Sequence, residues 1–154
     1  MRADRYLVEH GYFNTRARAQ AAITAGGVFA DGVQITKASQ KIAAGAEVSA
    51  EPAHPYVSRA ALKLAAGLDA FAIDPARLIC LDVGASTGGF TQVLLQRGAG
   101  FVAAVDVGRD QLHPSLRADA RVLSLEATDA RTLTLAMIGG RAPELIVCDA
   151  SFIS

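Results

Sequence analysis

A glycine-rich segment at residues 82–91 holds the densest group of residues that could bind a ligand. Asp82 ends an apolar run, and the chain continues as Val-Gly-Ala-Ser-Thr-Gly-Gly-Phe-Thr to Thr91. This order predicts a strand, a tight turn and the start of a helix. Such a turn brings backbone N–H groups and the positive end of a helix close to a ligand.

Three ligands compete for this turn. A dinucleotide fingerprint needs glycine at its third position, where Ser86 stands, and a phosphate-binding P-loop needs lysine where Phe90 stands. S-adenosylmethionine instead needs backbone donors plus an acid for its ammonium group, and Asp82 with the turn at 84–89 supplies both. The sequence favours S-adenosylmethionine, with an ordinary βα turn and capping acids as the alternative.

Acids also follow the next two apolar runs. Asp106 comes 24 residues after Asp82, a spacing that suits a carboxylate accepting hydrogen bonds from both ribose hydroxyls. Thr128-Asp129 follows the third run and could reach the adenine amino group. The predicted cofactor-binding residues are Asp82, Gly84, Ser86, Gly88, Gly89, Phe90, Asp106, Val107 and Asp129.

Strand-like and helical patterns alternate on both sides of this loop. A helix is predicted from a cap at Ser58, with Leu64, Leu68 and Phe71 as its buried stripe. The other predicted strands cover 78–83, 101–106, 122–125 and 145–148, and the other helices begin at 89 or cover about 112–117 and 132–138. This alternation predicts the parallel sheet of an α/β, Rossmann-like domain. Such sheets normally contain further strands, so the domain is expected to be incomplete at Ser154.

The first 50 residues predict a different, small α+β module. Asp4 is expected to cap a short helix, and Asn14 or Thr15 a second helix that ends at Gly26-Gly27. Asp31-Gly32 predicts a type I′ hairpin over 28–35, and 42–48 a further strand. The predicted organisation is therefore a module at 1–50, a linker at 51–57 and a partial α/β domain at 58–154.

Composition narrows the function only slightly. Fifteen basic and fifteen acidic residues cancel, which argues against a uniformly basic nucleic-acid binder. No apolar run approaches the roughly 18 residues of a membrane helix, and no signal core follows Met1, so a cytoplasmic protein without a membrane partner is expected. The three histidines lack ligand spacing, and no metal is predicted. Cys80 and Cys148 lie in apolar runs and are predicted to be core residues.

Several separated segments resemble known families. The loop at 82–91 and the helix start at 56–64 resemble the FtsJ-like ribose 2′-O-methyltransferases. Residues 2–7, 15–20, 26–28 and 31–33 resemble the RNA-binding module named after the fourth small-subunit ribosomal protein. The order of the two modules, together with 148–154, is similar to the TlyA family, often labelled haemolysin A.

This resemblance implies S-adenosylmethionine-dependent methylation of a cytidine ribose 2′-hydroxyl in ribosomal RNA, with ribosomal RNA or ribosomal subunits as partners. Lys63 and Asp149 match the first lysine and the aspartate of the family's Lys-Asp-Lys-Glu tetrad, whose other two members would lie beyond Ser154. Lys63 would orient or deprotonate the hydroxyl. The residues expected to contact RNA are Arg2, Arg16, Arg18, Lys37 and Arg59, the last on the same helix face as Lys63.

Two departures from the family pattern are small: Ala3 replaces a leucine, and Ala60-Ala61 replaces a glycine pair. The main alternative function is binding of RNA or cofactor without catalysis. A pore-forming haemolysin is a third class, against which stands the lack of an amphipathic or apolar segment long enough to insert. If the fourth strand lacks a further neighbour, its exposed edge is expected to favour association.

Overall fold

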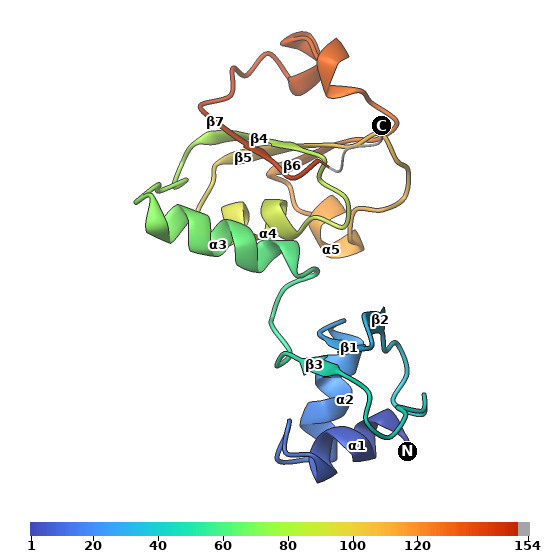
Figure 1. Cartoon of the computed structure of the whole chain (residues 1–154). Coiled ribbons are helices and arrows are strands. Elements are labelled where there is room, and N and C mark those ends of the chain that lie inside the picture. Colours follow the sequence, from blue (N-terminus) through green and yellow to red (C-terminus); the bar gives the residue numbers. More distant parts are fainter. Residues whose placement is uncertain (151–154) are drawn as a thin grey trace. The chain divides into compact units, whose positions relative to one another are not determined.

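The computed structural model describes residues 1–150, so the last four residues of the 148–154 motif lie outside the described part. The chain divides into two compact units, Met1–Pro55 and a second that begins at Tyr56 (Figure 1). Each unit has a hydrophobic core of its own. Each is therefore described separately.

The first unit packs two helices against a small antiparallel sheet. Its elements are α1 (Ala3–Glu9), α2 (Arg16–Thr24), β1 (Val28–Ala30), β2 (Val33–Gln34) and β3 (Val48–Ala50), with strand order β2-β1-β3. Thr15 caps α2, because its Oγ1 accepts a hydrogen bond from the Arg18 N–H at 3.3 Å. Asp31 and Gly32 both have positive φ, as a type I′ turn requires. The core contains Leu7, Ile23, Val28, Ile35 and Ile42.

Two expectations for this unit are wrong. Asp4 does not cap α1 but lies inside its first turn, where its side chain is fully buried. The segment 42–48 is not a strand, because Gly45 has a positive φ and the chain turns there, with the Ala46 N–H bonded to the Ala43 carbonyl. The third strand therefore begins only at Val48.

The second unit contains the predicted parallel sheet. Its elements are α3 (Ala60–Ala70), β4 (Ile79–Val83), α4 (Gly89–Gln96), β5 (Phe101–Val105), α5 (Pro114–Arg117), β6 (Val122–Leu125), the 3₁₀ turns η1 (Ala130–Thr132) and η2 (Ala136–Ile138), and β7 (Leu145–Cys148). The strand order is β6-β5-β4-β7, and every pair is parallel. The predicted α/β fold class is confirmed.

Apolar side chains fix which segments cover each face of this sheet. The three helices lie on one face and the η1–η2 segment on the other (Figure 1). Val93 and Leu94 of α4 pack with Leu64 of α3 and Val102 of β5 in one cluster, while Ile138 of η2 packs on Leu81 on the opposite face. The sheet therefore lies between two apolar layers.

Four local expectations for the second unit are wrong. Phe71 is 78% exposed, because α3 ends at Ala70 and the positive φ of Ala72 turns the chain away from the core. Ser58 does not cap α3, which begins at Ala60 after Arg59. The 3₁₀ turns η1 and η2 replace the helix predicted at 132–138. Gly139 and Gly140, which follow η2, both adopt positive φ.

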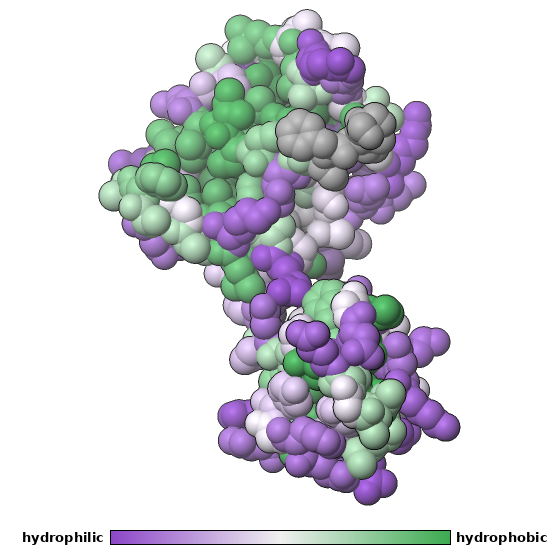
Figure 2. Space-filling view, viewed as in Figure 1, coloured by the Kyte–Doolittle hydropathy of each residue, from purple (hydrophilic) through white to green (hydrophobic). Residues whose placement is uncertain are grey.

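The fourth wrong expectation concerns one cysteine: Cys80 is buried, but Cys148 is exposed. Cys148 ends β7, which within residues 1–150 pairs only with β4. Ile146 on the same strand is also exposed, and an apolar area is visible on the second unit in Figure 2. Association through this edge stays a prediction. No helix in the described part of the chain is long and apolar enough to cross a membrane.

Candidate active site

The carboxyl ends of three neighbouring strands bring the candidate residues to one edge of the sheet. β4 lies between β5 and β7, so the connections run to opposite sides of β4. Ligands of open α/β sheets bind at such a reversal, outside the carboxyl ends of the strands. Asp82, Asp106 and Asp149 lie at the ends of β4, β5 and β7 respectively.

The glycine-rich loop depends on two glycines for different reasons. Gly88 precedes α4 with φ of 102°, a left-handed conformation that other residues rarely adopt. At Gly89, an added Cβ would overlap Ser58 Oγ and lie 2.9 Å from the Ala61 backbone nitrogen. Gly89 therefore allows the start of α3 to pack directly against the start of α4, and this contact fixes α3 beside the loop.

Substitution of Gly89 by alanine is expected to lower the free energy of unfolding by about 1–3 kcal/mol, because the new methyl group overpacks the α3–α4 contact. Gly67→Ala is the matched control, since a Cβ at this mid-helix position meets no atom within 4 Å. This control should raise stability by about 0.5–1 kcal/mol. Urea unfolding of both variants measures the two changes in the free energy of unfolding. Equal changes would contradict the close contact of Gly89 with the start of α3.

A cavity of about 330 Å³ opens at this loop. The predicted residues that line it are Gly84, Ser86, Gly89, Phe90 and Asp149, together with Ser58, Ala60, Ala85, Thr87 and Ala150. The cavity thus joins the loop to the start of α3 and to the end of β7. The predicted catalytic and cofactor-binding residues that do not line it are Lys63, Asp82, Gly88, Asp106, Val107 and Asp129.

Asp82 is fully buried beneath the loop. Thr91 Oγ1 donates a hydrogen bond to Asp82 Oδ2 at 2.7 Å, whereas Oδ1 has no partner among the described residues. Burial raises the pKa of Asp82 to about 6, and the charges of Asp106 and Asp149 add to the rise, against the hydrogen bonds from Thr91. Sequence reasoning missed Thr91, since its link to Asp82 arises only when α4 packs on β4.

Asp106 connects the loops that follow β4 and β5. Its Oδ2 accepts a hydrogen bond from the Ser86 N–H at 2.7 Å, and its Oδ1 accepts one from the Gly108 N–H at 2.8 Å. A carboxylate oxygen has two lone pairs, so each can accept a further hydrogen bond. The adjacent Val107 is strongly exposed.

Asp129 is engaged by a neighbour in sequence. Its carboxylate accepts hydrogen bonds from the Arg131 guanidinium, the shortest at 2.6 Å, and from the Arg131 backbone N–H at 2.9 Å. The Arg131 side chain, as the largest cause, lowers the pKa of Asp129 to about 2. The structure therefore gives Asp129 a local role as the cap of η1, and its contact with adenine stays a prediction.

Lys63 and Asp149 meet across 86 residues of sequence. Lys63 Nζ lies 3.0 Å from Asp149 Oδ1, and the two side chains are 69% and 36% exposed. Lys63 comes from α3, whereas Asp149 follows β7 and lines the cavity. An ion pair this open to solvent contributes little to stability, about 0–1 kcal/mol. Its position beside the cavity is therefore better explained by chemistry than by stability.

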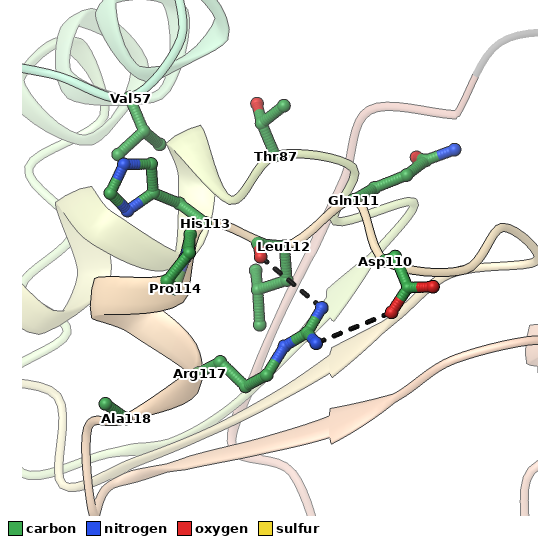
Figure 3. A pocket seen from close by; sticks show the side chains of 9 residues that line it. All are labelled: Val57, Thr87, Asp110, Gln111, Leu112, His113, Pro114, Arg117 and Ala118. Atoms are coloured by element: carbon green, nitrogen blue, oxygen red, sulfur yellow. Dashed lines mark hydrogen bonds and ion pairs between the residues drawn. The ribbon is translucent and has the colours of Figure 1, made fainter.

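A second hollow, of about 450 Å³, lies on the other side of Thr87 (Figure 3). Arg117 reaches the Leu112 carbonyl at 3.5 Å and the Asp110 carboxylate at 3.6 Å within it. It is larger than the loop cavity, but none of the catalytic or cofactor-binding residues predicted from the sequence lines it. We therefore take the smaller cavity as the candidate active site, because five of the predicted site residues line it.

The predicted RNA-binding residues lie in both units. Arg2 and Arg16 both contact the buried Asp4 carboxylate, while Arg18 and Lys37 are exposed. Arg59 is the residue before α3, four positions before Lys63. Sequence reasoning missed the part of Asp4 as the common partner of two of these arginines.

Comparison with known families agrees with this geometry. Residues 56–154 match the model of the FtsJ-like methyltransferases, and residues 1–48 match the S4 domain. The chain belongs to the FtsJ-like methyltransferase family. The resemblances to the FtsJ-like and S4 modules are thereby confirmed.

Relatives of this FtsJ-like chain share both of its units. It is 44% identical to hemolysin A of Brachyspira hyodysenteriae over all of this chain and 64% of the relative. It is 48% identical to the 16S/23S rRNA (cytidine-2′-O)-methyltransferase TlyA of Mycobacterium tuberculosis over 99% of this chain and 58% of the relative. A solved candidate hemolysin from Streptococcus thermophilus superposes with a TM-score of 0.68 at 39% identity, over 100% of this chain and 57% of the other. The chain thus spans about three fifths of the length of these relatives.

Proposed function

We propose that this protein takes part in S-adenosylmethionine-dependent methylation of a ribose 2′-hydroxyl, on a cytidine of ribosomal RNA. The observation that carries the proposal is the contact between Lys63 Nζ and Asp149 Oδ1 at 3.0 Å, since Asp149 lines the cavity at the glycine-rich loop. The printed activity of the Mycobacterium tuberculosis relative supports the choice of substrate.

The residues present fit this cofactor. The Oδ1 of Asp82, buried beneath the loop and outside the cavity lining, has no donor among the described residues, and the ammonium group of a methionine moiety is a donor of opposite charge. The first turn of α4 leaves N–H groups without intrahelical partners, which suits a carboxylate. Asp106 retains lone pairs for ribose hydroxyls beside the loop.

The chain's own contribution to the reaction is orientation. When bound, S-adenosylmethionine would supply an electrophilic methyl group on a positively charged sulfur. Asp149 lines the cavity and holds the Lys63 ammonium 3.0 Å away, from where Nζ could donate a hydrogen bond to the oxygen of a ribose hydroxyl. This contact aims the oxygen lone pair into the cavity, and the hydroxyl proton leaves to water. Correct placement of the two reacting groups supplies much of the rate of such transfers.

Recognition of RNA is assigned to the S4 domain and to Arg59. In the first unit, the exposed cations Arg18 and Lys37, together with Arg2 and Arg16, can contact phosphates. In the second unit, Arg59, which precedes α3, can do the same. Phosphate contacts set orientation on the RNA but carry no sequence information.

The proposal is tested by incubating the chain with methyl-labelled S-adenosylmethionine and purified ribosomal subunits. Label retained on cytidine 2′-oxygens after nuclease digestion is the expected result. Cofactor and RNA binding without transfer would favour a binding protein, and label on a base nitrogen or carbon would contradict ribose methylation.

Asp106→Ala is expected to weaken binding of S-adenosylmethionine about 10- to 100-fold, because hydrogen bonds to a charged acceptor contribute about 1.5–3 kcal/mol. Isothermal titration calorimetry measures the change. Asp110→Ala is the control, since this side chain is 87% exposed and its recorded contact is a 3.6 Å ion pair with Arg117. Equal affinities of wild type and Asp106→Ala would remove Asp106 from the cofactor site.

A further inference from the structure

We propose that Asp4 is a positioning residue that holds Arg2 and Arg16 together as one phosphate-binding pair on the first unit. The inference rests on the proposed RNA binding of the S4 domain and adds a specific site to it. Its ligand is a phosphodiester of the RNA backbone.

Both guanidinium groups converge on the Asp4 carboxylate. Arg2 Nε lies 3.1 Å from Oδ1 and Arg2 Nη2 lies 3.3 Å from Oδ2, while Arg16 Nη2 lies 2.6 Å from Oδ2. Gln20 Nε2 donates a third contact to Oδ2 at 3.0 Å. Arg2 precedes α1 and Arg16 begins α2, so the acid joins the starts of two helices.

Burial makes this arrangement rigid. The Asp4 side chain is fully buried, and an ionised carboxylate is tolerated there only because several donors surround it. Hydrogen bonds from Arg2, then Arg16, then Gln20 hold the pKa of Asp4 well below its usual range. The acid is therefore ionised at neutral pH and fixes the position of both arginines.

The two arginines keep capacity for a ligand. Their side chains are 49% and 55% exposed, although each contacts a fully buried acid. A guanidinium carries five N–H groups, and the contacts to Asp4 use Nε and Nη2 of Arg2 and only Nη2 of Arg16. The planar fork matches phosphate oxygens, and two such forks held in advance lose less freedom on binding than free side chains. The three charges sum to +1, which favours an anion.

The decisive test uses Asp4→Asn in the full chain and a fluorescein-labelled RNA hairpin with a duplex stem. A purely electrostatic account predicts tighter binding, because the variant loses a negative charge. The positioning account predicts weaker binding, by about fivefold or more at moderate salt, and a slope of log affinity against log salt that is smaller by about 1–2. Glu9→Gln is the charge-matched control on the exposed side of α1, and its affinity should be equal or higher.

Circular dichroism shows whether Asp4→Asn is folded. Two further variants separate loss of positioning from a folding defect. Arg16→Lys keeps the charge and should lose affinity if the fork matters. In an Arg2→Gln, Arg16→Gln background, Asp4→Asn should cause no further loss. Unchanged or tighter binding by folded Asp4→Asn, full affinity of Arg16→Lys or additive losses would overturn the proposal while leaving RNA binding intact. Absence of RNA binding by the wild type would overturn both.

Discussion

Replacement of Lys63 by methionine is expected to lower the rate of methyl transfer to ribosomal RNA by about 10²- to 10³-fold, the cost of removing one positioned hydrogen-bond donor from an active site. Methionine keeps the length of the side chain and removes its charge, so Asp149 loses the partner that lies 3.0 Å away. Because the lysine is 69% exposed, stability should change by less than about 1 kcal/mol. Single-turnover transfer of labelled methyl groups measures the effect.

Binding and chemistry are separated by measuring the affinity of the same variant for S-adenosylmethionine, which should stay within about threefold of the wild type. Lys41→Met is the control, an exposed lysine outside the proposed site. Transfer at the wild-type rate by Lys63→Met would exclude Lys63 from the reaction. A large loss in Lys41→Met would mean that transfer is limited by general electrostatic attraction to RNA.

Asp82→Asn is expected to change how stability depends on pH. The pKa of Asp82 is about 6 in the folded protein against an ordinary value of 3.8, so the folded state binds the proton more tightly than the unfolded chain. The stabilisation from this proton is therefore complete below about pH 4 and is lost as pH rises through 6. At about 1.4 kcal/mol per pKa unit, the loss is on the order of 3 kcal/mol.

Asparagine stays neutral throughout and can keep the hydrogen bond from Thr91. The stability of the variant relative to wild type should therefore rise by about 2–3 kcal/mol between pH 4 and pH 7. Urea unfolding at several pH values, without cofactor, measures this difference. The other titrating groups are the same in both proteins, so their contributions to stability cancel. Asp110→Asn, at an exposed position, is the matched control. A flat difference for Asp82→Asn would mean that the buried carboxyl is ionised at no cost.

Local sequence patterns were enough to predict most of the elements and the glycine-rich loop. Alternation of apolar runs with helical patterns predicts a parallel sheet, since parallel strands need a long crossover connection that is usually a helix. Asp31-Gly32 and Gly88 mark backbone positions with positive φ, a requirement that the residue type itself satisfies. The acids at the ends of β4 and β5 could be assigned to the site for the same reason: parallel strands end at one edge.

Tertiary packing decided what each of these residues contacts. The Lys63–Asp149 distance depends on the approach of α3 to the loop at Gly89, and no spacing in the sequence encodes it. Asp4 has the residue type and position of a helix cap, but α2 brings Arg16 and Gln20 over it and makes it a buried anchor. Cys80 and Cys148 lie in similar apolar runs, yet the first is buried and the second exposed; among residues 1–150, β4 has two neighbouring strands and β7 has one. Local residue patterns were enough to predict most elements and their order, apart from the segments at 42–48 and 132–138. Burial and charge pairing came from contacts between distant segments, which only the folded chain defines.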